Sequence, residues 1–406
     1  MDVQAGRDRP RVLIVTPQPF YEDRGTPIAV QYVARALAEI GVDVDLLAFP
    51  IGREVKIKNV TLKRCANLLH IRRVPIGFSW KKLVLDASLW TSFSKLLALR
   101  RYDMVHAVEE AAYIAAAICP RFGQPFIYDM ASAIPVELQR QPLLKSRRAQ
   151  RFLRSMERWV FHRATRVVCS PGLGRYVHNQ APDAPVTEWR FPAQLPHVPR
   201  QETESLRERL QIAPDRRIVL YSGSFAGYQG IDLLFEAFVQ ARRSNPELLL
   251  ICVGATEPEM AAWSKRTPKE LVGHVRILPR QPRERIAAYI ELADFLALPR
   301  GRTDNVPLKL FDYMASGKPI IAMRQAAYAP LLDQTRAFIC DPTPEALAQA
   351  IGRACRSPEE AHLMGQASLR YAHRQFGWGR FVDFVRDTYS KSIFTDREGS
   401  RLSRAS

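Results

Sequence analysis

The sequence has 406 residues, of which 47% are hydrophobic and 25% are charged. This length exceeds what one hydrophobic core usually organises, so we expect two domains, and the composition excludes a disordered or fibrous chain. The net charge of +18 indicates an anionic binding partner. The candidates are nucleic acid, anionic lipid and phosphorylated substrates.

The six cysteines stand singly, mostly in apolar surroundings, which favours neither a zinc site nor a disulfide framework and indicates a reducing compartment. Residues 1–11 mix aspartate with arginine and lack the layout of a signal peptide. The longest apolar stretches fall far short of the roughly 20 residues that span a bilayer. We therefore expect a cytoplasmic protein without a transmembrane helix.

The first part of the chain alternates short apolar strands with helices of apolar 3.6-residue periodicity. The expected strands cover residues 11–16, 42–49, 103–107, 125–130 and 165–170. This alternation predicts a parallel sheet covered by helices on both faces. A Pro-rich stretch over 182–199 interrupts the pattern and is interpreted as a linker.

The same alternation resumes after the linker and predicts a second doubly wound α/β domain. Its expected strands cover residues 217–224, 247–254, 274–279, 295–299, 319–323 and 337–341. We therefore place one Rossmann-like domain over 1–195 and another over 196–378. A C-terminal helix over 379–395 is expected to complete the first domain, and the polar tail 396–406 is expected to be disordered.

Ligands of open parallel sheets bind beyond the carboxyl ends of the strands, so the loops that follow strands are the candidate sites. The first such loop places Gly25 before a helix, with Thr26 as the expected N-cap and Pro27 in the first turn. Free backbone amides at this position suit a phosphate. A simple tight turn is the alternative interpretation.

A loop with three glycines, over 223–230, follows a strand and precedes a helix, as a diphosphate-binding loop does. Ser224 and Gln229 supply no positive charge, so the charge that neutralises a diphosphate must come from elsewhere. The candidate donor-binding residues in and beside this loop are Gly223, Ser224, Gln229 and Gly254.

The segment over 300–317 combines cations with two aspartates at the start of a helix. Asp304 lies just outside the expected helix and Asp312 about a turn and a half inside it, so both can line one ligand. The helix N-terminus, Lys309 and an arginine would form an anion site for a diphosphate, although solvated surface charge is the alternative. The candidate donor-binding residues here are Arg300, Arg302, Pro307, Leu308, Lys309 and Asp312.

His106 ends the strand at 103–107, and Glu109 and Glu110 open the next helix. A histidine at a strand end can act as a polar lid or a base. The alternatives are a hydrogen-bonded core histidine, and glutamates that only complement the helix dipole.

From Arg11 to about Tyr389 the sequence resembles the retaining GT-B glycosyltransferases of family four. The most specific match is DNVPLKLFDYMASGKPIIA (304–322), which resembles the family's two acids separated by seven residues. RGTPIAVQYVARALAEIGVDVDLL (24–47) and YSGSFAGYQGIDLLFEAF (221–238) add to the resemblance. It implies the GT-B fold, in which two Rossmann-like domains with doubly wound parallel sheets face each other across a cleft.

The resemblance also implies roles for donor-site residues. Asp312 takes the place of the acid that hydrogen-bonds the nucleotide's ribose, and Asp304 that of the catalytic acid facing the transferred sugar. Both are glutamates in most relatives. The family's phosphate-binding Arg and Lys correspond to Ser224 and Gln229, so we expect Lys309 to supply the missing charge.

On the acceptor side, His106 matches a histidine to which relatives give a catalytic role, and Glu109 is expected to lie near the acceptor. The resemblance implies a reaction that retains the anomeric configuration and needs no metal or other cofactor. Stabilisation of the leaving diphosphate is then the main catalytic contribution.

Residues 72–101 join seven cations to bulky apolar side chains such as Trp80 and Trp90. Such a stretch suits the headgroup region of an anionic membrane, whereas a core helix with a basic edge is the alternative. Membrane docking would place the protein on the inner face of the plasma membrane and favour a lipid-linked acceptor.

We therefore predict an enzyme that moves a sugar from a nucleotide-diphosphate sugar to a lipid-linked glycan or another envelope polysaccharide precursor. A sugar-nucleotide epimerase or hydrolase of the same fold, and a non-catalytic binding module, are the alternatives. We expect no nucleic-acid partner, because the basic sequence contains no recognisable nucleic-acid-reading motif.

Overall fold

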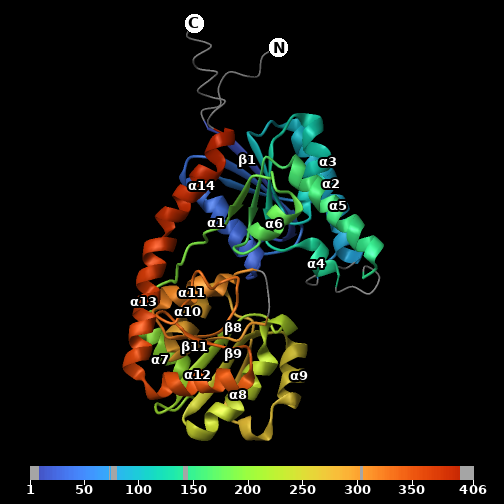
Figure 1. The fold of residues 1–406 in the computed structure, drawn as a ribbon. Coiled ribbons are helices and arrows are strands. Elements are labelled where there is room, and N and C mark those ends of the chain that lie inside the picture. The colour runs from blue at the N-terminus through green and yellow to red at the C-terminus, as the bar shows by residue number, and fades with distance from the viewer. Residues whose placement is uncertain (1–8, 73, 75–79, 140–144, 302–304, 394–406) are drawn as a thin grey trace. The chain divides into compact units, whose positions relative to one another are not determined.

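The computed structural model describes residues 9–72, 74, 80–139, 145–301 and 305–393, and the chain divides into two compact units. The first unit holds the residues up to Phe191 together with the segment from Gly379 onward, and the second runs from Pro192 to Trp378. Each unit is built on one parallel sheet with helices (Figure 1), so the predicted α/β class is confirmed.

The sheet of the first unit has seven strands in the order β3-β2-β1-β4-β5-β6-β7, and every neighbouring pair is parallel. The order reverses between β1 and β4, which is the position where open sheets form a ligand crevice. The strands are β1 (Arg11–Pro19), β2 (Asp43–Phe49), β3 (Val60–Arg64), β4 (Met104–Val108), β5 (Phe126–Met130), β6 (Arg166–Cys169) and β7 (Val186–Glu188).

Helices cover both faces of this sheet. The helices α2, α3 and α5 share one apolar core with the strands, and α1 meets α14 through a ring contact between Tyr32 and Phe381. The helices are α1 (Gly25–Glu39), α2 (Trp80–Leu99), α3 (Ala111–Ile118), α4 (Ile134–Leu138), α5 (Arg147–Arg163), α6 (Gly174–Gln180) and α14 (Trp378–Ile393). Across the described residues, no helix combines the length and the apolarity needed to cross a membrane.

The predicted linker over 182–199 is partly wrong, because its first half belongs to the sheet. β7 pairs with β6, and the Trp189 side chain that follows is 2% exposed and donates a hydrogen bond to Asp129. The proline content concealed a short edge strand, where missing backbone donors are tolerated. β3 was also not predicted, since it is short and mostly polar.

The sheet of the second unit has six parallel strands in the order β10-β9-β8-β11-β12-β13. Its order reverses between β8 and β11, so a ligand crevice is expected beyond the carboxyl ends of these two strands. The strands are β8 (Arg217–Ser222), β9 (Leu248–Ala255), β10 (Val275–Pro279), β11 (Phe295–Leu298), β12 (Ile320–Met323) and β13 (Phe338–Cys340).

The helices of the second unit also cover both faces, and α8 packs on α12 while α11 packs on α13. Helix α12 was not predicted, although Thr343 caps it by accepting a hydrogen bond from the amide of Ala346. The helices are α7 (Arg200–Arg209), α8 (Ile231–Ser244), α9 (Glu257–Arg266), α10 (Arg283–Leu292), α11 (Leu308–Ser316), α12 (Pro344–Arg356) and α13 (Pro358–Phe376).

Glu157 of α5 is fully buried, and burial raises the pKa of its carboxyl to about 7. Its Oε2 accepts a hydrogen bond of 2.5 Å from the hydroxyl of Tyr176. Between pH about 4.5 and about 7 the folded protein keeps this proton while the unfolded chain releases it, so stability falls as pH rises. We predict that Glu157→Gln removes this fall and raises the free energy of unfolding at pH 8 by about 1–2 kcal/mol.

Urea unfolding at a series of pH values, followed by circular dichroism, measures this effect. The control is Glu236→Gln, which changes an exposed glutamate of α8. An unchanged pH profile in Glu157→Gln would contradict the prediction.

Candidate functional site

The candidate donor site lies at the carboxyl ends of β8 and β11, where the strand order of the second unit reverses. Two segments meet there: the glycine loop 223–230 that follows β8, and the segment 299–307 that joins β11 to α11. The amide of Gly301 donates a 2.9 Å hydrogen bond to the carbonyl of Tyr228, which joins the two segments directly.

Glycines make this close approach possible. A Cβ on Gly230 would lie 1.8 Å from the carbonyl oxygen of Pro299, and the φ of Gly230 is +73°. Gly254 lies at the end of β9 with a φ of +124°. A Cβ on Gly254 would lie 2.3 Å from the carbonyl oxygen of Gly223. The loop therefore requires glycine at these positions for reasons of space as well as conformation.

Lys309 extends from the first turn of α11 to the glycine loop. Its Nζ donates a 3.2 Å hydrogen bond to Oε1 of Gln229 and lies 4.0 Å from the ring centre of Tyr221. A Cβ on Gly223 would come within 2.5 Å of the same Nζ. The amine of Lys309 thus reaches the glycine loop, in which Ser224 and Gln229 themselves carry no positive charge.

Burial lowers the pKa of Lys309 well below the ordinary lysine value, and repulsion from Arg300 lowers it further. Neither Lys309 nor Arg300 forms an ion pair with a carboxylate within the described ranges. Two basic side chains at one site, of which Arg300 is buried and Lys309 partly buried, favour the binding of an anion when no counter-charge lies among the described residues.

Arg300 follows β11 and is 5% exposed. Its Nη2 donates to Oδ1 of Asn305 at 2.7 Å, and its guanidinium lies 5.3 Å from the ring centre of Tyr228. Burial lowers the pKa of Arg300, and its Nε has no hydrogen-bond partner among the residues that the structure describes. An unsatisfied guanidinium nitrogen beside a glycine loop is suited to a phosphate oxygen.

Asp312 lies on α11 and accepts a 2.6 Å hydrogen bond from Nη2 of Arg283 at the start of α10. Burial raises the pKa of Asp312, while the guanidinium of Arg283 acts in the opposite direction. Arg283 thus fixes the position of the Asp312 carboxyl group, for which the family resemblance predicts a hydrogen bond to the ribose. Arg283 was not among the predicted site residues, because its only signal in the sequence is its place at a helix start.

Helix α11 begins at Leu308 after Pro307, and no described side chain caps it. Its first amides are therefore candidates for an anion. The Tyr313 hydroxyl accepts a 2.9 Å hydrogen bond from the amide of Ser222, which fixes α11 against the end of β8. Arg302 and Asp304 lie outside the described residues, so their predicted roles remain predictions.

In the first unit, Gly25 is the first residue of α1, and an added Cβ would meet no atom within 4 Å. The residue at the N-cap position is Arg24 and not Thr26, so the predicted cap is wrong. The helix starts two residues earlier than expected, because Pro27 is accommodated within its first turn.

His106 is fully buried in β4 with both ring nitrogens occupied. Nε2 lies 3.1 Å from Oδ2 of Asp129, and Nδ1 lies 2.6 Å from the hydroxyl of Tyr389 on α14. These partners correspond to the alternative of a hydrogen-bonded core histidine, and the predicted catalytic role of His106 stays a prediction. The strand-end motif suggested catalysis because the sequence could not reveal the partner on α14.

Glu109 follows β4 with a φ of +51°, which is uncommon for a residue other than glycine. Its carboxyl group is buried, and both oxygens lie 3.5 Å from the hydroxyl of Ser132. Burial and the adjacent Glu110 raise its pKa well above the ordinary value. Glu109 therefore lies beside the reversal point of the first sheet, a position compatible with an acceptor-side role.

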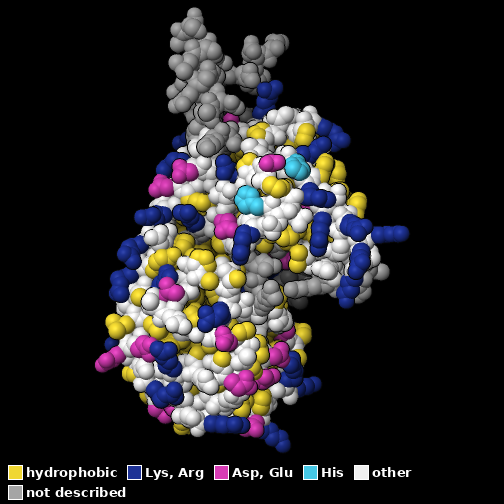
Figure 2. Space-filling model, in the orientation of Figure 1, with side chains coloured by type: hydrophobic (Ala, Val, Ile, Leu, Met, Phe, Trp, Pro, Cys, Tyr) yellow, Lys and Arg dark blue, Asp and Glu magenta, His cyan; other side chains and the backbone are white. Residues whose placement is uncertain are grey.

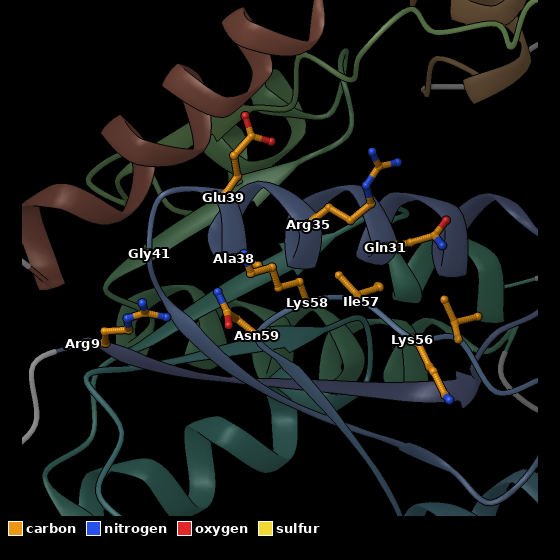
Figure 3. Close-up of a pocket in the computed structure, with 11 residues that line it drawn as sticks. Arg9, Gln31, Arg35, Ala38, Glu39, Gly41, Lys56, Ile57, Lys58 and Asn59 are labelled. Atoms are coloured by element: carbon orange, nitrogen blue, oxygen red, sulfur yellow. The ribbon is translucent and has the colours of Figure 1, made fainter.

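A separate groove of about 760 Å³ lies in the first unit between α1 and the segment that precedes β3 (Figure 3). None of the predicted site residues lines it. Gly41 and Asn59 line the end where β2 and β3 begin, whereas ligands of open sheets bind at the carboxyl ends. Its charged residues are Arg9, Arg35, Glu39, Lys56 and Lys58.

Two Rossmann-like units with parallel sheets define the GT-B class of glycosyltransferases. Sucrose-phosphate synthase from Thermosynechococcus elongatus has this fold, with a TM-score of 0.77 and 18% identity over 94% of this chain and 99% of that structure. HepE from Anabaena in complex with UDP-glucose is also similar, with a TM-score of 0.73 and 14% identity over 94% and 99%.

Two family models match the chain, one in each unit. The model described as "Glycosyl transferase 4-like domain" matches residues 24–190, and the model "Glycosyl transferases group 1" matches residues 202–370. The chain therefore belongs to the family of glycosyltransferases that these two models describe together.

Curated relatives are distant. The lipopolysaccharide 1,2-N-acetylglucosaminetransferase of Salmonella typhimurium is 23% identical over 47% of this chain and 54% of its own length. Most of these matches likewise span about half of the relative. A D-inositol 3-phosphate glycosyltransferase of Thermobispora bispora is 21% identical over 91% of this chain and 90% of its own.

We predict that Arg283→Met lowers the free energy of unfolding by about 2–3 kcal/mol, because it leaves the buried carboxylate of Asp312 without its partner. The double variant Arg283→Met/Asp312→Asn recovers part of the loss, since the unpaired charge is then removed. Urea unfolding of both variants measures the effect, and a stability of Arg283→Met equal to the parent would contradict it.

Proposed function

We propose that this protein transfers a sugar from a nucleotide-diphosphate sugar to an acceptor, with the donor held by the second unit. The observation that carries this proposal is the placement of two basic side chains, the partly buried Lys309 and the buried Arg300, beside the glycine loop without a carboxylate partner in the described ranges. A diphosphate supplies the missing counter-charge. HepE, a structural neighbour, was solved in complex with UDP-glucose, which supports the same class of donor here.

In the proposed reaction the bond between the sugar and the diphosphate breaks, and negative charge develops on the departing phosphate. The acceptor hydroxyl oxygen bonds to the anomeric carbon, and its proton passes to the departing phosphate. Lys309, Arg300 and the first amides of α11 stabilise this charge. These groups perform the neutralisation that a metal provides in other enzymes, so we propose that no metal is required. Asp312 binds the ribose, Asp304 faces the sugar, and the product retains the anomeric configuration.

We further propose a lipid-linked acceptor, such as an envelope polysaccharide precursor, used at the inner face of the plasma membrane. Two curated relatives support this class of acceptor by name, the Salmonella lipopolysaccharide enzyme and a phosphatidylinositol monomannoside mannosyltransferase of Mycolicibacterium smegmatis. The D-inositol 3-phosphate glycosyltransferases among the relatives favour a non-lipid acceptor as the second candidate.

The proposed activity is tested by screening UDP-, GDP- and ADP-sugars for thermal stabilisation, followed by incubation with a lipid extract or with inositol phosphate in the presence of EDTA. A glycosylated acceptor with the donor's anomeric configuration supports the proposal. Free sugar alone would identify a hydrolase, an altered donor sugar an epimerase, and the absence of turnover a binding module.

Lys309→Met is predicted to weaken donor binding by about 10- to 100-fold, because it removes the charge and keeps the packing against Tyr221. Isothermal titration calorimetry with the donor identified in the screen measures the loss. Lys265→Ala, at an exposed position of α9, is the matched control and keeps the affinity of the parent. Equal affinities in Lys309→Met and the parent would refute the role of Lys309.

Donor affinity is also predicted to fall as pH rises through the lowered pKa of Lys309 in the empty site, because only the protonated amine neutralises the diphosphate. A nucleotide-diphosphate sugar is the suitable probe, since it has no terminal phosphate that titrates near neutrality. Dissociation constants across a pH series test this, and the fall must be absent from Lys309→Met. A pH dependence shared by both proteins would assign it to another group.

A further inference from the structure

Helix α5 of the first unit exposes a row of cations and no acid. The single acidic residue of this helix, Glu157, is buried and bonded to Tyr176. In the described part of the chain, no carboxylate forms an ion pair with the exposed arginines of the first two turns. The exposed basic residues in and next to α5 are Lys145, Arg147, Arg148, Arg151, Arg154, Arg158 and Arg163.

Large apolar side chains are exposed on the same face of the sheet. Phe152 lies within the basic row and is 64% exposed, while Trp80 and Leu83 of α2 are 61% and 53% exposed. The opposite side of α2 is buried through residues such as Leu89 and Phe93. Helix α2 is therefore a core helix that also presents large apolar side chains to solvent, and its contact with a membrane stays a prediction.

The two helices lie on one face of the sheet, since α3 contacts both of them (Figure 1). Each precedes a parallel strand and runs antiparallel to it, so both begin at the carboxyl edge of the sheet. Lys82 of α2 accordingly bonds to Glu110 just beyond β4. Figure 2 shows Lys and Arg side chains gathered over the side of this unit where α5 lies.

We propose that the first turns of α5 and α2 form a docking surface for an anionic lipid bilayer, with the arginines on the headgroups and Phe152, Trp80 and Leu83 in the interface. Charge complementarity selects an anionic partner, and the exposed aromatic and leucine side chains favour a bilayer over a nucleic acid. This surface deepens the proposed function, on whose lipid-linked acceptor it rests. It brings the carboxyl edge of the first sheet, and therefore Glu109, close to the lipid.

The experiment is co-sedimentation of the full chain with vesicles of phosphatidylcholine alone and of phosphatidylcholine mixed with phosphatidylglycerol, at low and high salt. The parent is expected to bind the anionic vesicles in a salt-sensitive manner. Arg147→Gln/Arg148→Gln/Arg151→Gln is expected to bind at least about tenfold more weakly, because each cation near the surface contributes roughly fivefold. Phe152→Ser is expected to weaken binding at high salt, where the apolar contribution remains.

The matched control is Arg285→Gln/Arg370→Gln/Arg374→Gln. It removes the same number of positive charges at exposed positions of the second unit. It is expected to bind vesicles as the parent does. Circular dichroism and nucleotide-sugar affinity, unchanged in all variants, show that the fold and the donor site are intact.

Three results would overturn the proposal: no binding of the parent to anionic vesicles, full binding by the α5 triple variant, or an equal loss in both triple variants. Binding of the parent to a nucleic-acid duplex and not to vesicles would also overturn it. A failure of glycosyl transfer with vesicle binding intact would count against the proposed function alone.

Discussion

Lys309 lies partly buried beside a glycine loop, without a carboxylate partner in the described ranges, and the donor site depends on this placement of its amine. Placing a charge away from water without a counter-charge costs free energy, and the Arg300 Nε without a hydrogen-bond partner in the described ranges increases this cost. Lys309 and Arg300 keep these positions only if packing in the rest of the second unit holds them there. The bond from Ser222 to Tyr313 and the contact between Gly230 and Pro299 provide that rigidity.

The first unit uses its buried polar groups differently. His106, Asp129, Trp189 and Tyr389 satisfy one another in a chain of hydrogen bonds that ties α14 to the sheet. Because every ring nitrogen and both carboxylate oxygens have a partner, this network stabilises the core. The chemistry of this unit is therefore expected at the loop ends, where Glu109 is held with a positive φ.

The excess positive charge of the chain has at least two physically distinct locations. In the second unit, Arg300 is buried and Lys309 is partly buried, and both act over the short distances of a ligand site. On α5 the arginines are exposed and screened by salt, so they suit a large anionic surface whose charges act together. A single number for the net charge could not separate these two uses.

The alternation of strands and helices, the glycine loop and the spacing of Asp304 and Asp312 could be predicted from the sequence, because periodicity and turn chemistry are local. Tertiary structure alone decided which side chains meet. Lys309 reaches Gln229 across 80 residues, and His106 meets Tyr389 across 283. Partner choice depends on how distant elements pack, so the same strand-end histidine that suggested catalysis became part of the core.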